Sequence, residues 1–386
     1  MKVTLKKILL STILIGTVLD AHAQSSVTLY GRLDAGLEYM TGVPTNPNSS
    51  GAAQSSTGRV RLVSGDYQSS FWGIKGTEDL GGGNKVLFQL ESEFNLMNGQ
   101  GASGGDLFNR WAQVGIANDT YGTIMMGRQF FIANDVWDFD PFGQTSWASG
   151  TLVRGRNWPF VSNNISYQSP KIAGFDFAGQ YSFSNATSFN GNGTTSQGRN
   201  AGAHITYTSA LFQVRAMYDE VRNPADGSLG GAIDPVNNAN VSGGAFAYSR
   251  EYTAAVNVLL GQVKIQGAYQ AIRSSDETDV LQGTPTTLDH EWGGVNWQVT
   301  PAAALIAAVY HVNANNGGGN ATMYTIGGTY NLSKRTLLNF QIATTQNSKT
   351  ANFALNANNP GTSVSTDNPL PGHSQSGVYA GIQTLF

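Results

Sequence analysis

The chain has 386 residues, a formal net charge of −3 and only 12% charged residues, with 47 glycines and 10% aromatics. Such a mildly acidic chain does not attract nucleic acid, and the absence of cysteine excludes a disulfide framework and thiolate chemistry. The composition fits a barrel whose outer face meets lipid, and equally a secreted all-β solenoid or adhesin.

The N-terminal residues predict export. Three lysines in the first seven residues precede an apolar stretch at 8–19 and the small-x-small sequence Ala21-His22-Ala23. The apolar stretch is shorter than the roughly 20 residues that a membrane helix needs. We therefore expect a signal peptide at 1–23 and a mature barrel domain at 24–386.

Long alternating segments predict the strands. In residues 27–39 the apolar side chains share one face, whereas Arg32, Asp34 and Glu38 share the other. Residues 85–94 repeat the pattern, with Glu91 and Glu93 on the polar face. These segments exceed the roughly 5–6 residues of a typical soluble strand and match the roughly 9–11 of a tilted membrane strand.

Short and long connections alternate along the chain, as the turns and loops of a membrane barrel do. Gly, Pro, Asn and Asp dominate most of the short ones. Seven short turns and eight long loops predict sixteen strands, and one missed hairpin would change this to 14 or 18. The short turns are at 80–84, 118–122, 170–174, 209–210, 260–261, 300–303 and 332–335, and the long loops are at 41–58, 97–106, 130–161, 184–199, 220–244, 274–287, 313–320 and 346–374.

The last predicted strand, 378–386, alternates up to the aromatic residue Phe386. A membrane barrel needs such a strand to close its cylinder, because an open edge has no hydrogen-bond partners in lipid. We predict that Phe386 takes part in barrel closure.

Several segments, in order along the mature chain, resemble the general diffusion porins of beta-proteobacterial outer membranes. They are Ser26–Asp34, Trp72–Gly81, Phe88–Ser92, Leu107–Arg110, Gly122–Gln129, Tyr167–Pro170 and Tyr330–Thr336. The resemblance implies an all-β fold: a 16-stranded antiparallel transmembrane β-barrel with an inward-folded third external loop, forming a homotrimer in the outer membrane of a Gram-negative bacterium. It also implies a water-filled channel for small hydrophilic solutes and ions, in contact with outer-membrane lipid and lipopolysaccharide and without a cofactor.

The loop at 130–161 is the one we expect to fold inward. It carries Asp135, Asp138 and Asp140, followed by Pro141-Phe142-Gly143, which resembles the acidic loop tip of the family. We predict that the three aspartates face the narrowest part of the pore. The alternative is a solvated loop in which aspartate only favours turns.

A basic wall is expected opposite that loop. Strand parity places Arg32 and Lys75 on the inner face, and the resemblance places Arg110 there, although Ala112 would share its face. Arg128 either lines the pore or anchors the loop.

Further residues are candidates for the lumen of the barrel. Arg59 and Arg61 are either lumenal or at the rim, and Glu91 and Glu93 fall on the lumenal face. Phe71 stands where the family often has an arginine, so it removes a positive charge and puts a ring into the lumen. Because Glu93 also adds a negative charge, the sequence does not decide between anion and cation selectivity.

No arrangement of the five histidines suggests a metal site or a catalytic triad, so we expect no enzyme and no cofactor. A substrate-specific channel for a sugar or an aromatic acid is the alternative function. It would need a lumenal aromatic track, for which Tyr30, Trp111, Trp137, Trp147 and Trp158 are candidates. A surface-binding protein or barrel enzyme with an incidental pore is a third hypothesis.

The trimer follows from the resemblance. Gln113, aligned with an outward position of the family, would meet a neighbouring subunit more comfortably than lipid. The glycine-rich loop at 97–106 would reach over the next barrel.

Overall fold

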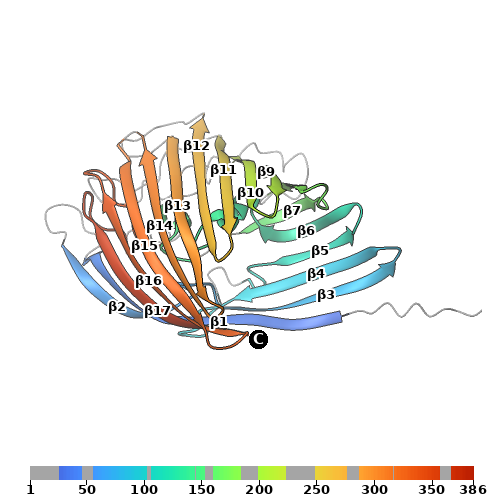
Figure 1. The fold of residues 1–386 in the computed structure, drawn as a ribbon, viewed down its shortest axis with the longest axis horizontal. Coiled ribbons are helices and arrows are strands. Elements are labelled where there is room, and N and C mark those ends of the chain that lie inside the picture. Colours follow the sequence, from blue (N-terminus) through green and yellow to red (C-terminus); the bar gives the residue numbers. More distant parts are fainter. Residues whose placement is uncertain are drawn as a thin grey trace, which may run out of the picture.

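The computed structural model describes residues 26–45, 55–101, 106–143, 145–152, 160–183, 199–222, 248–275, 287–315, 317–356 and 367–386. The predicted signal peptide at 1–23 lies outside these residues. Within them, seventeen strand segments form one antiparallel sheet that closes on itself, because the last segment pairs with the first (Figure 1).

The strands follow one another around the barrel in chain order. They are β1 (Ser26–Pro44), β2 (Ser56–Ser64), β3 (Phe71–Gly81), β4 (Asn84–Glu93), β5 (Ala112–Asn118), β6 (Gly122–Phe130), β7 (Phe160–Gln168), β8 (Phe175–Ser182), β9 (Arg199–Thr208), β10 (Phe212–Arg222), β11 (Tyr248–Leu260), β12 (Val263–Ser275), β13 (Thr287–Thr300), β14 (Ala303–Ala314), β15 (Gly319–Asn331), β16 (Thr336–Asn347) and β17 (Gln375–Leu385).

Two segments, β2 and β3, occupy a single position in the barrel. Both pair with β1: β3 along residues 26–32 and β2 along residues 35–44. The seventeen segments therefore build a 16-stranded barrel, as predicted. The seven short turns and eight long loops expected from the sequence all separate consecutive strands.

The break between β2 and β3, at residues 65–70, was not predicted. It begins at Gly65, whose φ of 86° is accessible mainly to glycine. Across the break, the Ser70 hydroxyl accepts a hydrogen bond from Asp34 N (2.9 Å) and donates one to Asp34 O (3.1 Å). One side chain thus satisfies the backbone groups that the interrupted ladder leaves on β1.

The strands expose apolar side chains on the outer face of the barrel. On β14, Leu305 and Val309 are exposed, whereas the alternating residues Ile306, Tyr310 and Val312 are buried. This period-two pattern matches an outer surface in contact with lipid. No helix that the described residues form is both long and apolar enough to cross a membrane.

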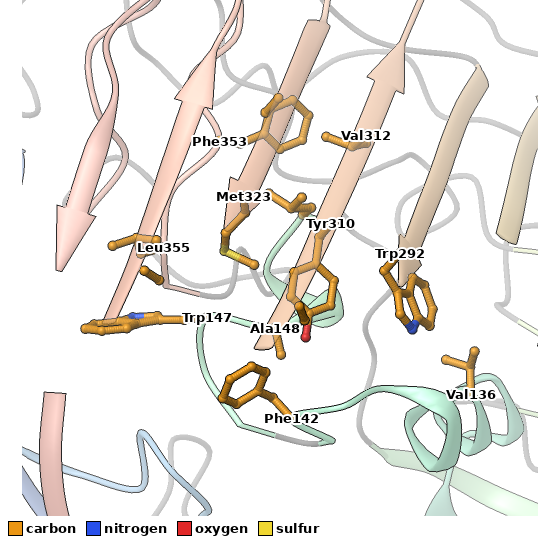
Figure 2. Close-up of a cluster of buried hydrophobic side chains, with 14 of the residues drawn as sticks. Val136, Phe142, Trp147, Ala148, Trp292, Tyr310, Val312, Met323, Phe353 and Leu355 are labelled. Atoms are coloured by element: carbon orange, nitrogen blue, oxygen red, sulfur yellow. The ribbon is translucent and has the colours of Figure 1, made fainter. Parts of the chain in front are cut away.

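The inner face of the barrel carries much of the buried core. The described residues of the third long loop, 131–143 and 145–152, enter it through the 3-10 helix η1 (Ile132–Phe139) and the short helix α1 (Ser149–Leu152). Its apolar side chains pack against inward residues of β13–β15 and against the loop that follows β16 (Figure 2). This cluster includes Val136, Phe142, Trp147, Ala148, Trp292, Tyr310, Val312, Met323, Phe353 and Leu355.

The barrel closes at Phe386. Its N–H and carbonyl exchange two 3.1 Å hydrogen bonds with Gly31 of β1, and Leu385 N donates to Arg335 O at 2.8 Å. A Cβ on residue 31 would lie 2.4 Å from the Phe386 ring, so the glycine lets the ring lie over β1.

Deletion of Phe386 should weaken barrel closure, because it removes both hydrogen bonds to Gly31 and the ring contact. We expect a loss of about 1–3 kcal/mol, from two bonds worth about 0.5–1.5 kcal/mol each. The measurement is the urea midpoint of the folded band on unboiled gels, and Phe386→Leu, which keeps the backbone bonds, is the control. Equal midpoints for the deletion and the wild type would contradict this role.

Candidate pore constriction

The third long loop is anchored to the wall at its first residues. Gln180 on β8 accepts a hydrogen bond from Ile132 N (2.8 Å) and donates one to Phe130 O (2.7 Å). In η1, Ile132, Val136 and Phe139 are buried, whereas Asp138 lies on the open side. This amphipathic spacing turns the apolar side of η1 to the barrel wall.

Asp140 holds the turn that follows η1. Its carboxylate accepts hydrogen bonds from the Tyr310 hydroxyl (2.7 Å), Phe142 N (2.9 Å) and Ser149 N (2.9 Å), and the residue is only 3% exposed. Burial raises the pKa of this carboxyl, and the hydrogen bonds from Ser149, Tyr310 and Phe142 oppose the rise. The prediction that Asp140 faces the pore is wrong in geometry: it fastens the loop to β14.

Asp135 and Asp138 keep the exposure expected of pore groups, with side chains 42% and 63% exposed. Each has a basic neighbour on the adjacent wall. Asp135 Oδ2 lies 2.9 Å from His204 Nε2, and Asp138 Oδ2 lies 2.9 Å from Arg215 Nη1.

Sequence reasoning did not assign His204 and Arg215 to this site. His204 alternates with the exposed Ile205, and Arg215 with the exposed Val214. Strand parity would therefore have placed both on the inner face.

Arg32 and Lys75 lie on the inner wall, as their parity predicted. Arg32 Nε donates to Ser69 O (2.8 Å), its guanidinium also donates to Gln68 Oε1, and it lies 5.0 Å from the centre of the Phe71 ring. Lys75 is exposed, with Nζ 4.7 Å from the centre of the Tyr30 ring. In the described part of the chain, no carboxylate lies within ion-pair distance of either side chain.

Arg110 differs from the expected free cation. It forms ion pairs with Glu91 (3.0 Å) and Glu93 (2.7 Å), and its side chain is 7% exposed. The rings of Phe71, Phe130 and Phe160 surround its guanidinium at 4.8–5.6 Å from their centres. The expectation of a wall cation is corrected here, because a buried arginine needs compensating carboxylates.

Arg128 has the geometry of an anchor. Its Nε donates to Asn109 O and its Nη1 to Ser162 Oγ, both at 2.8 Å. The ladder between β6 and β7 shifts register at this residue. The sequence left Arg128 either in the pore lining or as an anchor of the third long loop, whereas these contacts attach the segment before β5 to β7.

Arg59 and Arg61 point inward, since they alternate with the exposed Val60 and Leu62. Arg61 Nε lies 2.7 Å from Glu38 Oε1, and Arg59 Nη1 lies 2.5 Å from Asp367 Oδ1. These ion pairs tie β1 and β2 to the loop that follows β16.

The ion pairs with Arg59 and Arg61 stabilise the charged form of the Asp367 carboxyl. Burial alone would raise the pKa of its carboxyl, but hydrogen bonds from Arg59 and Asn356, together with the charges of Arg61 and Arg59, lower it below the usual value. The stabilisation is present above the ordinary aspartate pKa of about 4 and is lost as the pH falls through the lowered pKa.

Two further expectations are corrected. Gln113 donates to Gln89 Oε1 (2.9 Å) and faces inward, whereas its neighbours Val114 and Ile116 are exposed. It therefore cannot face another subunit. Trp147 is fully buried and does not line an open passage, and Trp158 lies outside the described residues.

Two other candidates for an aromatic track lie together near the start of the third long loop. Trp111 and Trp137 both contact Phe130 edge-on, with ring centres 5.1 and 6.3 Å apart. The Tyr30 hydroxyl donates to Glu91 Oε1 at 2.6 Å. The described residues contain no group of three or more histidines or carboxylates that could hold a metal ion.

Comparison with known proteins decides the family. Residues 11–350 match the family model described as Gram-negative porin. The chain belongs to the Gram-negative porin family. It is 29% identical to an outer membrane porin of Bordetella pertussis over 86% of this chain and 92% of that protein. It is 27% identical to outer membrane porin protein 32 of Delftia acidovorans, over 99% and 100% of the two chains.

Solved structures agree on the fold. The anion-selective porin from Comamonas acidovorans superposes with a TM-score of 0.72 at 23% identity, covering 94% of this chain and all of that one. The porin described here forms a diffusion channel in the outer membrane of a Gram-negative bacterium, and it is not an enzyme.

Asn substitutions should separate two kinds of aspartate in the third long loop. Asp140→Asn replaces an acceptor oxygen with an NH2 group facing N–H or O–H donors. We expect it to loosen the turn at a cost of about 1–3 kcal/mol and to produce several conductance levels. Asp138→Asn should keep one level and shift the permeability ratio toward anions by at most about fivefold, since an exposed unit charge is worth about 1 kcal/mol.

Single-channel recording in a planar bilayer measures both quantities. If Asp140→Asn gave one conductance level and only a shift in zero-current potential, as expected of Asp138→Asn, the anchoring role of Asp140 would be wrong.

Proposed function

We propose that this porin is a general diffusion channel whose selectivity is set where the third long loop faces the inner wall of β1 and β3. The exposed carboxylates of Asp135 and Asp138 stand on the loop, and Arg32 and Lys75 stand on the wall. Opposed charges across a narrow water-filled passage orient polar solutes and disfavour apolar ones.

The observation that carries the proposal is the unequal pairing of these charges. Asp138 pairs with Arg215, and Asp135 lies beside His204, which is charged only when protonated. Arg110 pairs with two carboxylates, those of Glu91 and Glu93. Arg32 and Lys75 have only neutral partners among the described residues. Arg32 and Lys75 are thus the two cations of this set that no carboxylate pairs, and we infer that they attract anions. The set as a whole carries four cations and four carboxylates, so we infer only a weak preference for anions.

A relative supports the direction of this preference. The solved porin from Comamonas acidovorans is described as anion-selective. Phe71, at a position where the family often has arginine, makes a weaker preference the expected result for this chain.

We also infer that the functional unit is a homotrimer. OmpT of Vibrio cholerae, solved in a trimer form, has the same fold at a TM-score of 0.64 and 14% identity. A band above monomer size on unboiled gels that disappears on heating would support the trimer, and a monomer band alone would contradict it.

Removal of the two unpaired cations tests the proposed selectivity. Arg32→Gln combined with Lys75→Gln should shift the permeability ratio toward cations by at least about fivefold and at most about 30-fold, because each of the two unit charges that leave the passage is worth at most about 1 kcal/mol. The zero-current potential in a salt gradient measures the ratio. The matched control is Lys334→Gln with Arg335→Gln, which removes the same charges from an exposed short turn.

Equal zero-current potentials for the two double variants would contradict the proposal. Liposome swelling separates the alternative function: a smooth decline of entry rate with solute size supports general diffusion. Saturable entry of one sugar or one aromatic acid would instead indicate a substrate-specific channel.

A further inference from the structure

Four glycines on the inner wall lie directly under side chains of the third long loop. A Cβ added to Gly202 on β9 would be 2.5 Å from Ile132 Cγ2, and one added to Gly294 on β13 would be 2.6 Å from Pro141 Cγ. For Gly327 on β15 the nearest loop atom is Phe142 Cε1, at 2.9 Å, and for Gly377 on β17 it is Trp147 Cη2, at 2.8 Å. Real Cβ atoms essentially never approach another atom this closely.

The backbone does not require glycine at these positions. None of the four has a φ in the left-handed region, unlike the turn residues Gly81, Gly82 and Gly83. Glycine inside a strand also weakens it, because it adds backbone entropy and packs no side chain. These glycines instead leave room for the side chains of the third long loop.

The loop side chains that occupy this space come from successive parts of the third long loop. Ile132 begins η1, Pro141 and Phe142 form the turn after it, and Trp147 precedes α1. The glycines opposite them lie on strands from β9 to β17, so the loop packs closely against the wall at successive points around it. Trp147 and Phe142 lie against this wall in Figure 2.

We propose that Gly202, Gly294, Gly327 and Gly377 are positioning residues that set how deeply the third long loop lies against the wall, and hence how wide the pore is. The proposal rests on the proposed function, in which this loop bounds the passage. A methyl group at any of the four positions would push the loop away from the wall, and the open side of the lumen is the direction in which the loop can move.

Gly377 is the sharpest test position. The nearest atoms to its added Cβ are all side-chain atoms: Trp147 Cη2 and Cζ2 and Leu355 Cδ1, at 2.8–3.0 Å. Trp147 is fully buried, its Nε1 donates to Asn356 Oδ1 (3.0 Å), and its carbonyl accepts from Thr325 Oγ1 (2.8 Å). At Gly294 and Gly327, by contrast, backbone oxygens at 2.4 and 2.5 Å would also clash, so substitutions there would disturb the strands themselves.

The experiment compares Gly377→Ala, Trp147→Phe and the double variant with Gly293→Ala. Gly293 lies beside Gly294 on β13, and an added Cβ there has no atom within 4 Å, so its variant controls for the loss of a strand glycine. Phenylalanine lacks the Cη2 and Cζ2 atoms that the new methyl would meet. Folding is checked by the heat-sensitive band, and pore width by single-channel conductance and the swelling rates of liposomes with graded sugars.

We expect Gly377→Ala to lose conductance and to exclude larger sugars, and Gly293→Ala to match the wild type. In the Trp147→Phe background, Gly377→Ala should cause no further loss. Wild-type conductance in a folded Gly377→Ala porin, or an equal loss in both backgrounds, overturns the proposal. If Gly377→Ala yields no folded protein, the same cycle with Gly202→Ala and Ile132→Ala has the same deciding outcomes.

These outcomes are distinct from a failure of the proposed function. The proposed function is contradicted if the wild-type channel shows no size cut-off. It is also contradicted if the double variant Arg32→Gln, Lys75→Gln keeps the wild-type ion selectivity. A normal wild-type channel with an unchanged Gly377→Ala variant contradicts only the role of the glycines.

Discussion

Dry packing of the third long loop against the inner wall of the barrel is the contact on which the pore depends. A loop of this length loses much conformational entropy when it is ordered, at roughly 1–2 kcal/mol per residue. Full burial of Phe139, Trp147 and Leu152 offsets part of this cost, at about 1.5–3 kcal/mol for each large apolar side chain.

Hydrogen bonds from the wall to the loop backbone complete the attachment. Trp292 Nε1 donates to Phe139 O at 3.0 Å, and Thr325 Oγ1 donates to Trp147 O at 2.8 Å. Buried carbonyls without such donors would be costly, so the inner wall needs polar groups at these points as well as apolar ones. These hydrogen bonds, together with the apolar packing, therefore fix the position of the loop on the wall.

This attachment divides the lumen into two unlike sides. The side formed by β13–β17 is filled by the third long loop and by residues 351–355 of the last long loop, which are buried beside it. Asn356 bonds Trp147, and Asp367 pairs with Arg59, so the two loops and the wall support one another. The side formed by β1 and β3 keeps Arg32 and Lys75, which have no ion-pair partner among the described residues, and we propose that the water-filled path follows them.

Period-two alternation made much of this predictable. It identified the strands, and it placed Arg32 and Lys75 on the inner face. Turn residues located most of the short turns, because glycine, proline and asparagine act locally. The same parity would have found Arg215 and His204 had it been applied to their strands.

Other features depend on partners far away in the sequence. Asp140 is buried because Tyr310 reaches it from β14, and Arg110 is held in ion pairs because β4 carries Glu91 and Glu93. The alignment that turned Gln113 outward failed for the same kind of reason, since its partner Gln89 lies on β4. The break at residues 65–70 depends on the Ser70 hydroxyl replacing ladder bonds, which no periodicity signals.

Cysteine labelling during bilayer recording tests the central contact most directly, because the chain has no cysteine of its own. A water-soluble thiol reagent should react quickly with Asp138→Cys, on the open side of the loop, and reduce its current. Ala148→Cys, placed in the dry contact at 0% exposure, should keep its current under the same treatment. Equally fast loss of current in both variants would contradict a packed loop and, with it, this account of the pore.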